Sequence, residues 1–151
     1  MQNRVVVVTA AAVAVAGLAA CSSEPQPNHP SQASVTINGN TVATKQTVTC
    51  SQQANTLPGA APQWYWTIAV GDKNVSGVRA LLNGSTDKLT AESVHIVNLG
   101  GFTGTYAIDD GGQATASFGS ETFTITGTAN GFNTYKPDQP ATATFKIVAT
   151  C

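Results

Sequence analysis

The feature that most constrains the fold is a regular alternation of large apolar side chains with other side chains along short runs of the sequence. The clearest run is 64–70, Trp-Tyr-Trp-Thr-Ile-Ala-Val, in which Trp64 and every second residue after it are large and apolar. Successive side chains of an extended chain point to opposite faces, so this run predicts a strand with one buried face. Tyr65 belongs to the other face of that strand.

Similar short runs recur from residue 34 to the end, separated by turn residues at intervals of about 8–12 positions. The Asn-Gly pair at 38–39 and the Asp-Asp-Gly-Gly run at 109–112 each predict a hairpin turn. Only 10% of the residues are charged, Thr and Gly are abundant, and Leu and Glu are scarce, which disfavours helices. We therefore expect an all-β fold, an antiparallel sandwich or open barrel of roughly eight to ten short strands, in a single domain over 34–151.

Residues 1–20 have the pattern of a secretory signal peptide, with a positive charge at Arg4 and an apolar run at 5–16. That run is shorter than the roughly 20 apolar residues of a transmembrane helix. Cys21 follows Leu-Ala-Ala directly, and this pattern looks like a bacterial lipobox. We expect cleavage before Cys21 and acylation of its sulfur by a diacylglyceryl group, because only cysteine offers a nucleophilic thiolate. The alternative is an ordinary signal peptide followed by a chance cysteine.

Residues 21–33 are expected to form the acylated cysteine and a flexible tether. This segment contains three prolines and no large apolar side chain, and proline biases it toward extended conformations. His29 lies here and is expected to be a solvated linker residue. Two or more acyl chains give a stable anchor, so we predict a protein held by lipid at the extracytoplasmic face of the cell membrane.

The chain has three cysteines, and assigning Cys21 to lipid leaves Cys50 and Cys151. An exported compartment permits a disulfide between them, which would close a loop of about a hundred residues. Both residues are in phase with the apolar positions of their runs. The alternative is a pair of free thiols.

Trp64, Tyr65 and Trp66 are the candidate ligand-binding residues, because neighbouring aromatic rings offer a stacking platform for a sugar or a lipid. Two Trp on one strand face are more commonly part of a hydrophobic core, which leaves Tyr65 as the candidate on the exposed face.

No pattern in the sequence predicts catalysis, a metal site or a cofactor. His95 is the only histidine of the predicted domain, whereas a zinc site needs three or four converging ligands. Neither a Gly-x-Ser-x-Gly elbow nor a phosphate-binding loop is present. The formal net charge is −1 and no basic patch exists, which disfavours nucleic acid as a partner. We therefore expect a protein that is not an enzyme.

The lipobox and polar tether are followed by a cysteine after Val-Thr, by Ile-Thr-Gly-Thr-Ala-Asn-Gly at 125–131 and by the terminal Phe-Lys-Ile-Val-Ala-Thr-Cys. Together these segments resemble the mycobacterial nineteen-kilodalton lipoprotein antigen family. The resemblance implies an acylated, surface-exposed antigen of the cell envelope, with its terminal cysteine paired to Cys50. It also implies recognition by host Toll-like receptor 2 through the lipid, and a role in ligand transport.

We therefore expect an envelope lipoprotein antigen, anchored by Cys21, whose β domain binds or carries an apolar or glycolipid ligand. The alternative function is a structural or adhesive envelope module without a small-molecule ligand. An apolar cavity of useful size would distinguish the first function from the second.

Overall fold

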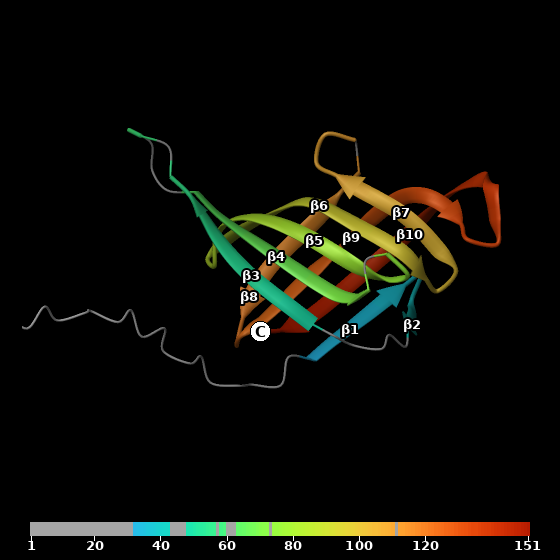
Figure 1. The fold of residues 1–151 in the computed structure, drawn as a ribbon, viewed down its shortest axis with the longest axis horizontal. Coiled ribbons are helices and arrows are strands. Elements are labelled where there is room, and N and C mark those ends of the chain that lie inside the picture. Colours follow the sequence, from blue (N-terminus) through green and yellow to red (C-terminus); the bar gives the residue numbers. More distant parts are fainter. Residues whose placement is uncertain (1–31, 43–47, 57, 60–62, 73, 111) are drawn as a thin grey trace, which may run out of the picture.

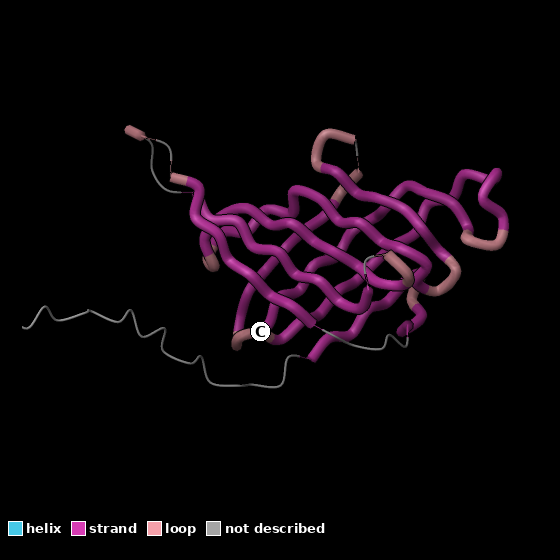
Figure 2. Tube along the Cα trace, viewed as in Figure 1, coloured by secondary structure: helices cyan, strands magenta, loops and turns pink. Residues whose placement is uncertain are grey.

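The computed structural model describes residues 32–42, 48–56, 58–59, 63–72, 74–110 and 112–151. In these ranges the chain forms ten strands and no helix (Figure 2). Nothing helical in the described ranges is therefore long and apolar enough to cross a membrane. The strands are β1 (Gln32–Ile37), β2 (Asn40–Val42), β3 (Val48–Asn55), β4 (Gln63–Asp72), β5 (Ser76–Ser85), β6 (Lys88–Leu99), β7 (Phe102–Ala107), β8 (Ala114–Gly119), β9 (Thr122–Asn133) and β10 (Lys136–Thr150).

The first strand begins slightly earlier than the sequence predicts. β1 starts at Gln32, so the last two residues assigned to the tether belong to the sheet. The predicted signal peptide, Cys21 and the tether up to residue 31 lie outside the described residues.

All ten strands belong to one antiparallel sheet, which confirms the predicted all-β class as a single open sheet. Its order is β2-β1-β10-β9-β7-β6-β5-β4-β3, with β8 beside β9. The sheet curls on itself, so that β3 to β6 cross in front of β8 to β10 in Figure 1. The two edge strands are β2 and β3.

Apolar side chains from both halves of the curled sheet fill its inside, as the alternation along the strands predicts. Polar and charged residues are absent from the fully buried set within the described ranges. The core consists of Val35, Ile37, Ile68, Val70, Val78, Ala80, Leu82, Ala91, Val94, Ile96, Leu99, Phe102, Tyr106, Phe123, Ile125, Ala129, Ala143, Phe145, Ile147 and Ala149.

The hairpin predicted at Asn38-Gly39 is confirmed. Both residues have positive φ, 50° and 78°, which is the backbone of a tight turn between antiparallel strands. Asn38 also docks this turn onto β10. Its N–H donates to the carbonyl of Thr144 at 2.9 Å, and its Oδ1 accepts from the Thr144 N–H at 2.9 Å.

The hairpin predicted at 109–112 is wrong, because β7 and β8 do not pair with each other. Both lie along the same side of β9, β7 against residues 130–133 and β8 against residues 122–127. Hydrogen bonds from the Ile108 N–H to the Glu92 carbonyl and from the Thr128 N–H to the Gln113 carbonyl, each 3.0 Å, fix the end of β7 and the start of β8. The turn residues therefore interrupt one strand line instead of reversing the chain.

Candidate ligand pocket beside the disulfide

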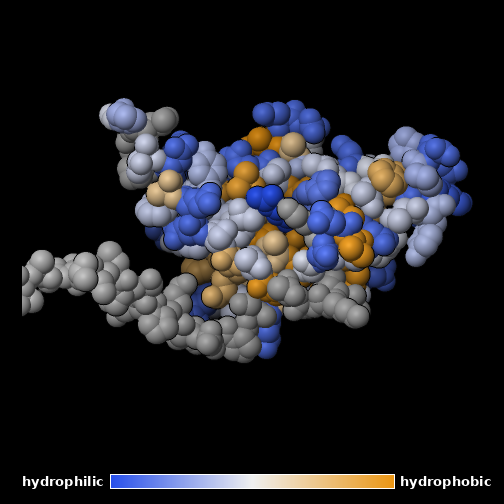
Figure 3. Space-filling model, in the orientation of Figure 1, coloured by the Kyte–Doolittle hydropathy of each residue, from blue (hydrophilic) through white to orange (hydrophobic). Residues whose placement is uncertain are grey.

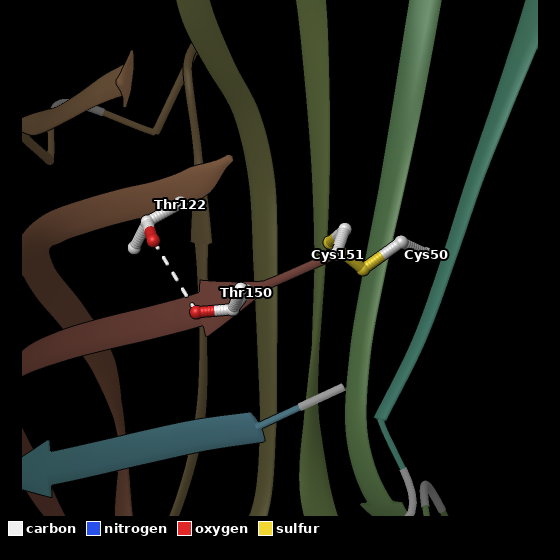
Figure 4. Close-up of a disulfide and its surroundings, with 4 residues drawn as sticks. All are labelled: Cys50, Thr122, Thr150 and Cys151. Carbon is white, nitrogen blue, oxygen red and sulfur yellow. Dashed lines mark hydrogen bonds between the residues drawn. A yellow bond between two sulfur atoms is a disulfide. The ribbon is translucent and has the colours of Figure 1, made fainter. Parts of the chain in front are cut away.

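A disulfide joins edge strand β3 to the end of β10 and draws the two halves of the curled sheet together. Cys50 and Cys151 are bonded across a sequence separation of 101, with their Cα atoms 6.0 Å apart. Figure 4 shows the bond bridging from the end of β10 to β3. Five strands lie between β3 and β10 in the sheet order. The disulfide prediction is confirmed, and the alternative of two free thiols is wrong.

The last residues of the chain are also fixed by hydrogen bonds to the β8–β9 turn. The hydroxyl groups of Thr150 and Thr122 lie 3.2 Å apart, as the dashed line in Figure 4 marks. The N–H of Cys151 donates to the carbonyl of Glu121 at 3.2 Å. This end of the fold therefore has a defined shape right up to the terminal residue.

Three aromatic rings pack together next to the disulfide. Trp66 comes from β4, and its ring centroid lies 5.2 Å from that of Phe123 and 6.4 Å from that of Phe118. The two Phe rings face each other across the β8–β9 hairpin, with centroids 4.5 Å apart. Tilted pairs at such distances are favourable beyond the area they bury. The rings form an apolar wall contributed by both halves of the sheet.

A pocket of about 290 Å³ opens between this wall and the disulfide. That volume is near the lower end of the roughly 300–1,000 Å³ range of ligand pockets, so it suits a single ring or part of an acyl chain. Its lining is Cys50, Ser51, Gln52, Trp66, Phe118, Glu121, Phe123 and Cys151.

The indole N–H of Trp66 has no hydrogen-bond acceptor although the atom is buried. Leaving a buried donor unpaired costs about 1–3 kcal/mol, and Trp N–H groups usually find a partner when buried. The nitrogen itself is closed to solvent, so an oxygen acceptor in the pocket reaches it only after the Trp66 ring turns toward the opening. The pocket therefore has the size of a small binding site, and one of the residues that line it has an unpaired polar group.

The three predicted aromatic residues differ in exposure and in their distance from the pocket. Trp66 lines the pocket, but Trp64 is 40% exposed beyond it, and Tyr65 is half-buried on the other face. The hydroxyl of Tyr65 donates to Gln63 Oε1 at 3.2 Å. Tyr65 is thus less exposed than Trp64, the reverse of what the alternation predicts. Ligand binding by these residues stays a prediction.

Phe118, Glu121 and Phe123 are pocket residues that the sequence did not single out. The signal was present, since two Phe flank a short turn at positions that face each other once the hairpin forms. What the sequence lacked was the register that brings this hairpin against Trp66.

Away from the pocket, the titratable residues of the described ranges are scattered over the sheet. No group of three His, Cys, Asp or Glu side chains converges in the described ranges. His95 lies on the outer face of β6, with Nδ1 3.1 Å from the hydroxyl of Thr105 and with Arg79 opposite it on β5. Burial raises the pKa of Tyr106 above its usual value, and Glu92 and Asp109 raise it further.

The chain is similar to one protein family and to several named proteins. A family model described as the Mycobacterium 19 kDa lipoprotein antigen matches residues 26–151. A protein of Mycobacterium indicus pranii named as a lipoprotein is 41% identical over 151 residues, covering all of both chains. A protein of Mycobacterium avium subsp. hominissuis, also named as a lipoprotein, is 40% identical over 151 residues. The match covers all of this chain and 97% of that relative. LppE of Mycobacterium tuberculosis, named as a probable lipoprotein, is 34% identical over 152 residues and is fully covered.

Proposed function

Because the chain belongs to the Mycobacterium 19 kDa lipoprotein antigen family, we propose that it is an envelope lipoprotein whose β domain binds an apolar ligand. Cys21 carries the acyl anchor, and the domain stands on the extracytoplasmic side of the cell membrane. Host Toll-like receptor 2 recognises the acyl group. This role is one of anchoring and binding, with no catalytic step.

The anchor is supported by the residues around Cys21. A basic start, an apolar run and Leu-Ala-Ala precede the cysteine, and three relatives that share the full length are named as lipoproteins. A diacylglyceryl group supplies two chains, which hold a protein on a bilayer far longer than one chain does.

The binding role rests on one observation, the 290 Å³ pocket lined by Trp66, whose buried indole N–H is unpaired. Three aromatic rings and the disulfide supply apolar contact, and the N–H supplies one directional contact to an oxygen. The ligand class that satisfies both is a hydrocarbon or ring that carries a carbonyl, ester or ether oxygen. The competing function, a structural or adhesive module, gives no role to this donor.

Native mass spectrometry of the mature protein, released from mild detergent, tests the binding role. We expect an adduct of lipid mass that is lost on denaturation. Trp66→Phe keeps an aromatic ring but removes the donor, so it should weaken binding about tenfold, the effect of one hydrogen bond. The matched control is Trp64→Phe, which alters an exposed ring outside the pocket lining and should retain the adduct. A bare mass for the unsubstituted protein, under conditions that preserve bound lipid, would favour the structural module.

A further inference from the structure

We propose that the pocket opens at the membrane-proximal end of the domain and takes the acyl chain of a neutral, hydroxyl-bearing lipid from the bilayer that anchors the protein. This inference rests on the proposed binding function and adds the source and the headgroup class of the ligand. It follows from where the tether joins the sheet, how long it is and which polar groups surround the pocket.

The tether joins the domain beside the pocket. Gln32, the first residue of β1, is the antiparallel partner of Thr150, and the next residue, Cys151, lines the pocket. Paired residues of antiparallel strands have Cα atoms about 5 Å apart. The β8–β9 turn with Glu121 lies at the same end, hydrogen-bonded to Cys151. The point of attachment and the pocket therefore share one end of the molecule.

The length of the tether keeps this end close to the lipid. Gln32 follows Cys21 by 11 residues, so a fully extended chain places it no more than about 40 Å from the acylated sulfur. β10 runs 15 residues from the opposite end of the domain to the pocket end, which at about 3.3 Å per residue is close to 50 Å. The tether therefore lets the pocket end reach the bilayer surface, whereas the β9–β10 hairpin at Tyr135 lies at the opposite end of the domain.

The polar groups of the pocket favour an uncharged headgroup. Ser51, Gln52 and Glu121 line it together with the apolar residues, and no Lys, Arg or His is among the described residues of its lining. The carboxylate of Glu121 repels a phosphate and accepts hydrogen bonds from hydroxyl groups. A glycolipid or diacylglycerol fits this arrangement better than an anionic phospholipid. Its ester oxygen is the acceptor for the Trp66 N–H once that ring turns toward the pocket.

Tryptophan quenching by brominated acyl chains tests the inference. The mature acylated protein with Trp64→Phe keeps Trp66 as its only indole. It is reconstituted in phosphatidylcholine vesicles that contain a brominated-chain glycosyl diacylglycerol. We expect saturable quenching of Trp66 by the glycolipid and at least fivefold weaker quenching by brominated phosphatidylglycerol. Glu121→Gln removes the negative charge, so it should reduce the difference in quenching between the glycolipid and phosphatidylglycerol.

An inverted anchor is the control for orientation. A leaderless chain with Trp64→Phe, Cys21→Ser and Tyr135→Cys is coupled to a maleimide lipid, so that the domain is anchored through a residue that is 83% exposed at its far end. Quenching by the membrane glycolipid should fall at least fivefold, while a water-soluble brominated alkyl glucoside should quench both proteins equally.

The two proposals fail in different ways. Absence of quenching by the soluble glucoside overturns the binding function itself. Quenching by the glucoside but not by the membrane glycolipid, or equal membrane quenching in both orientations, leaves binding intact and overturns uptake from the anchoring bilayer. Stronger quenching by phosphatidylglycerol than by the glycolipid overturns the assignment of the headgroup.

Discussion

Trp66 and Phe123 lie with their ring centroids 5.2 Å apart although they come from β4 and β9, in opposite halves of the curled sheet. Phe123 is fully buried, and Trp66 packs on it from the side of the pocket. Phe123→Ala should therefore destabilise the domain by about 3–5 kcal/mol, the usual cost of removing a buried aromatic ring. Urea unfolding followed by circular dichroism measures it. Phe118→Ala is the control, since Phe118 is only half-buried; an equal loss for both variants would contradict the role given to Phe123.

The disulfide should contribute about 2–4 kcal/mol to the free energy of unfolding, somewhat below the chain-entropy limit for a loop of this length. The double substitution Cys50→Ser with Cys151→Ser, and reduction of the unsubstituted protein, should lower the urea midpoint by the same amount. Adding reductant to the double variant should change nothing further. An unchanged midpoint after complete reduction would show that the β3 edge is held by packing alone.

The β8–β9 turn is built from residues that do not favour its backbone. Ser120 and Glu121 have φ of 50° and 60°, a region where a residue other than glycine loses about 1–2 kcal/mol. Replacing the pair by Asn-Gly, through Ser120→Asn with Glu121→Gly, should stabilise the domain by about 1 kcal/mol. Thermal unfolding measures the gain. Asn38 and Gly39 already combine residues that favour positive φ, so Gly39→Ala should destabilise the domain. No change in stability at either turn would refute the view that backbone strain at positive φ limits stability there.

Tyr106 should make the fold sensitive to alkali. Its pKa in the folded state is raised, by burial first and then by Glu92 and Asp109, above the unfolded value of about 10. A raised folded pKa means that the group stabilises the fold below pH 10, and that this stabilisation is lost as the pH rises through the folded pKa. The urea midpoint should fall as the pH rises from about 10 through the folded pKa. In the Tyr106→Phe variant, the midpoint should fall less steeply over the same pH range. A fall of equal steepness in the Tyr106→Phe variant would contradict this role for Tyr106.

Cys21 should decide where the protein resides. Cys21→Ala removes the sulfur that receives the lipid, so the product should move from the detergent phase to the aqueous phase in a partitioning experiment. Intact mass of the unsubstituted protein should include a diacylglyceryl group. Cys50→Ser is the control, because its thiol is bonded to Cys151 and its loss should leave the partitioning unchanged.

Sequence patterns predicted what depends on neighbours along the chain. The alternation in 64–70 predicted a strand, and Asn38-Gly39 predicted a turn, because both are set by local backbone geometry. The Asp-Asp-Gly-Gly run marked a departure from the sheet but not the next pairing partner. That partner is β9, a strand long enough to pair with both β7 and β8, and only long-range register fixes it.

The candidate site was predicted in part for the same reason. Alternation put Trp64 and Trp66 on one face but carried no information about how far the opposite half of the sheet extends over them. Phe118 and Phe123 reach Trp66 and stop short of Trp64, which stays 40% exposed. The pocket is formed at the edge of the contact between Phe118, Phe123 and Trp66. The position of that edge depends on long-range pairing and is not encoded by a local pattern.

The covalent tie at Cys151 has a practical consequence for work with this molecule. A purification handle or fluorescent fusion attached directly after Cys151 would emerge from a disulfide-bonded residue that lines the cavity, where it would compete with a bound ligand. Reporters are better inserted at the hairpin of Thr134 and Tyr135, where the Tyr135 ring is 83% exposed and the cavity lies at the other pole.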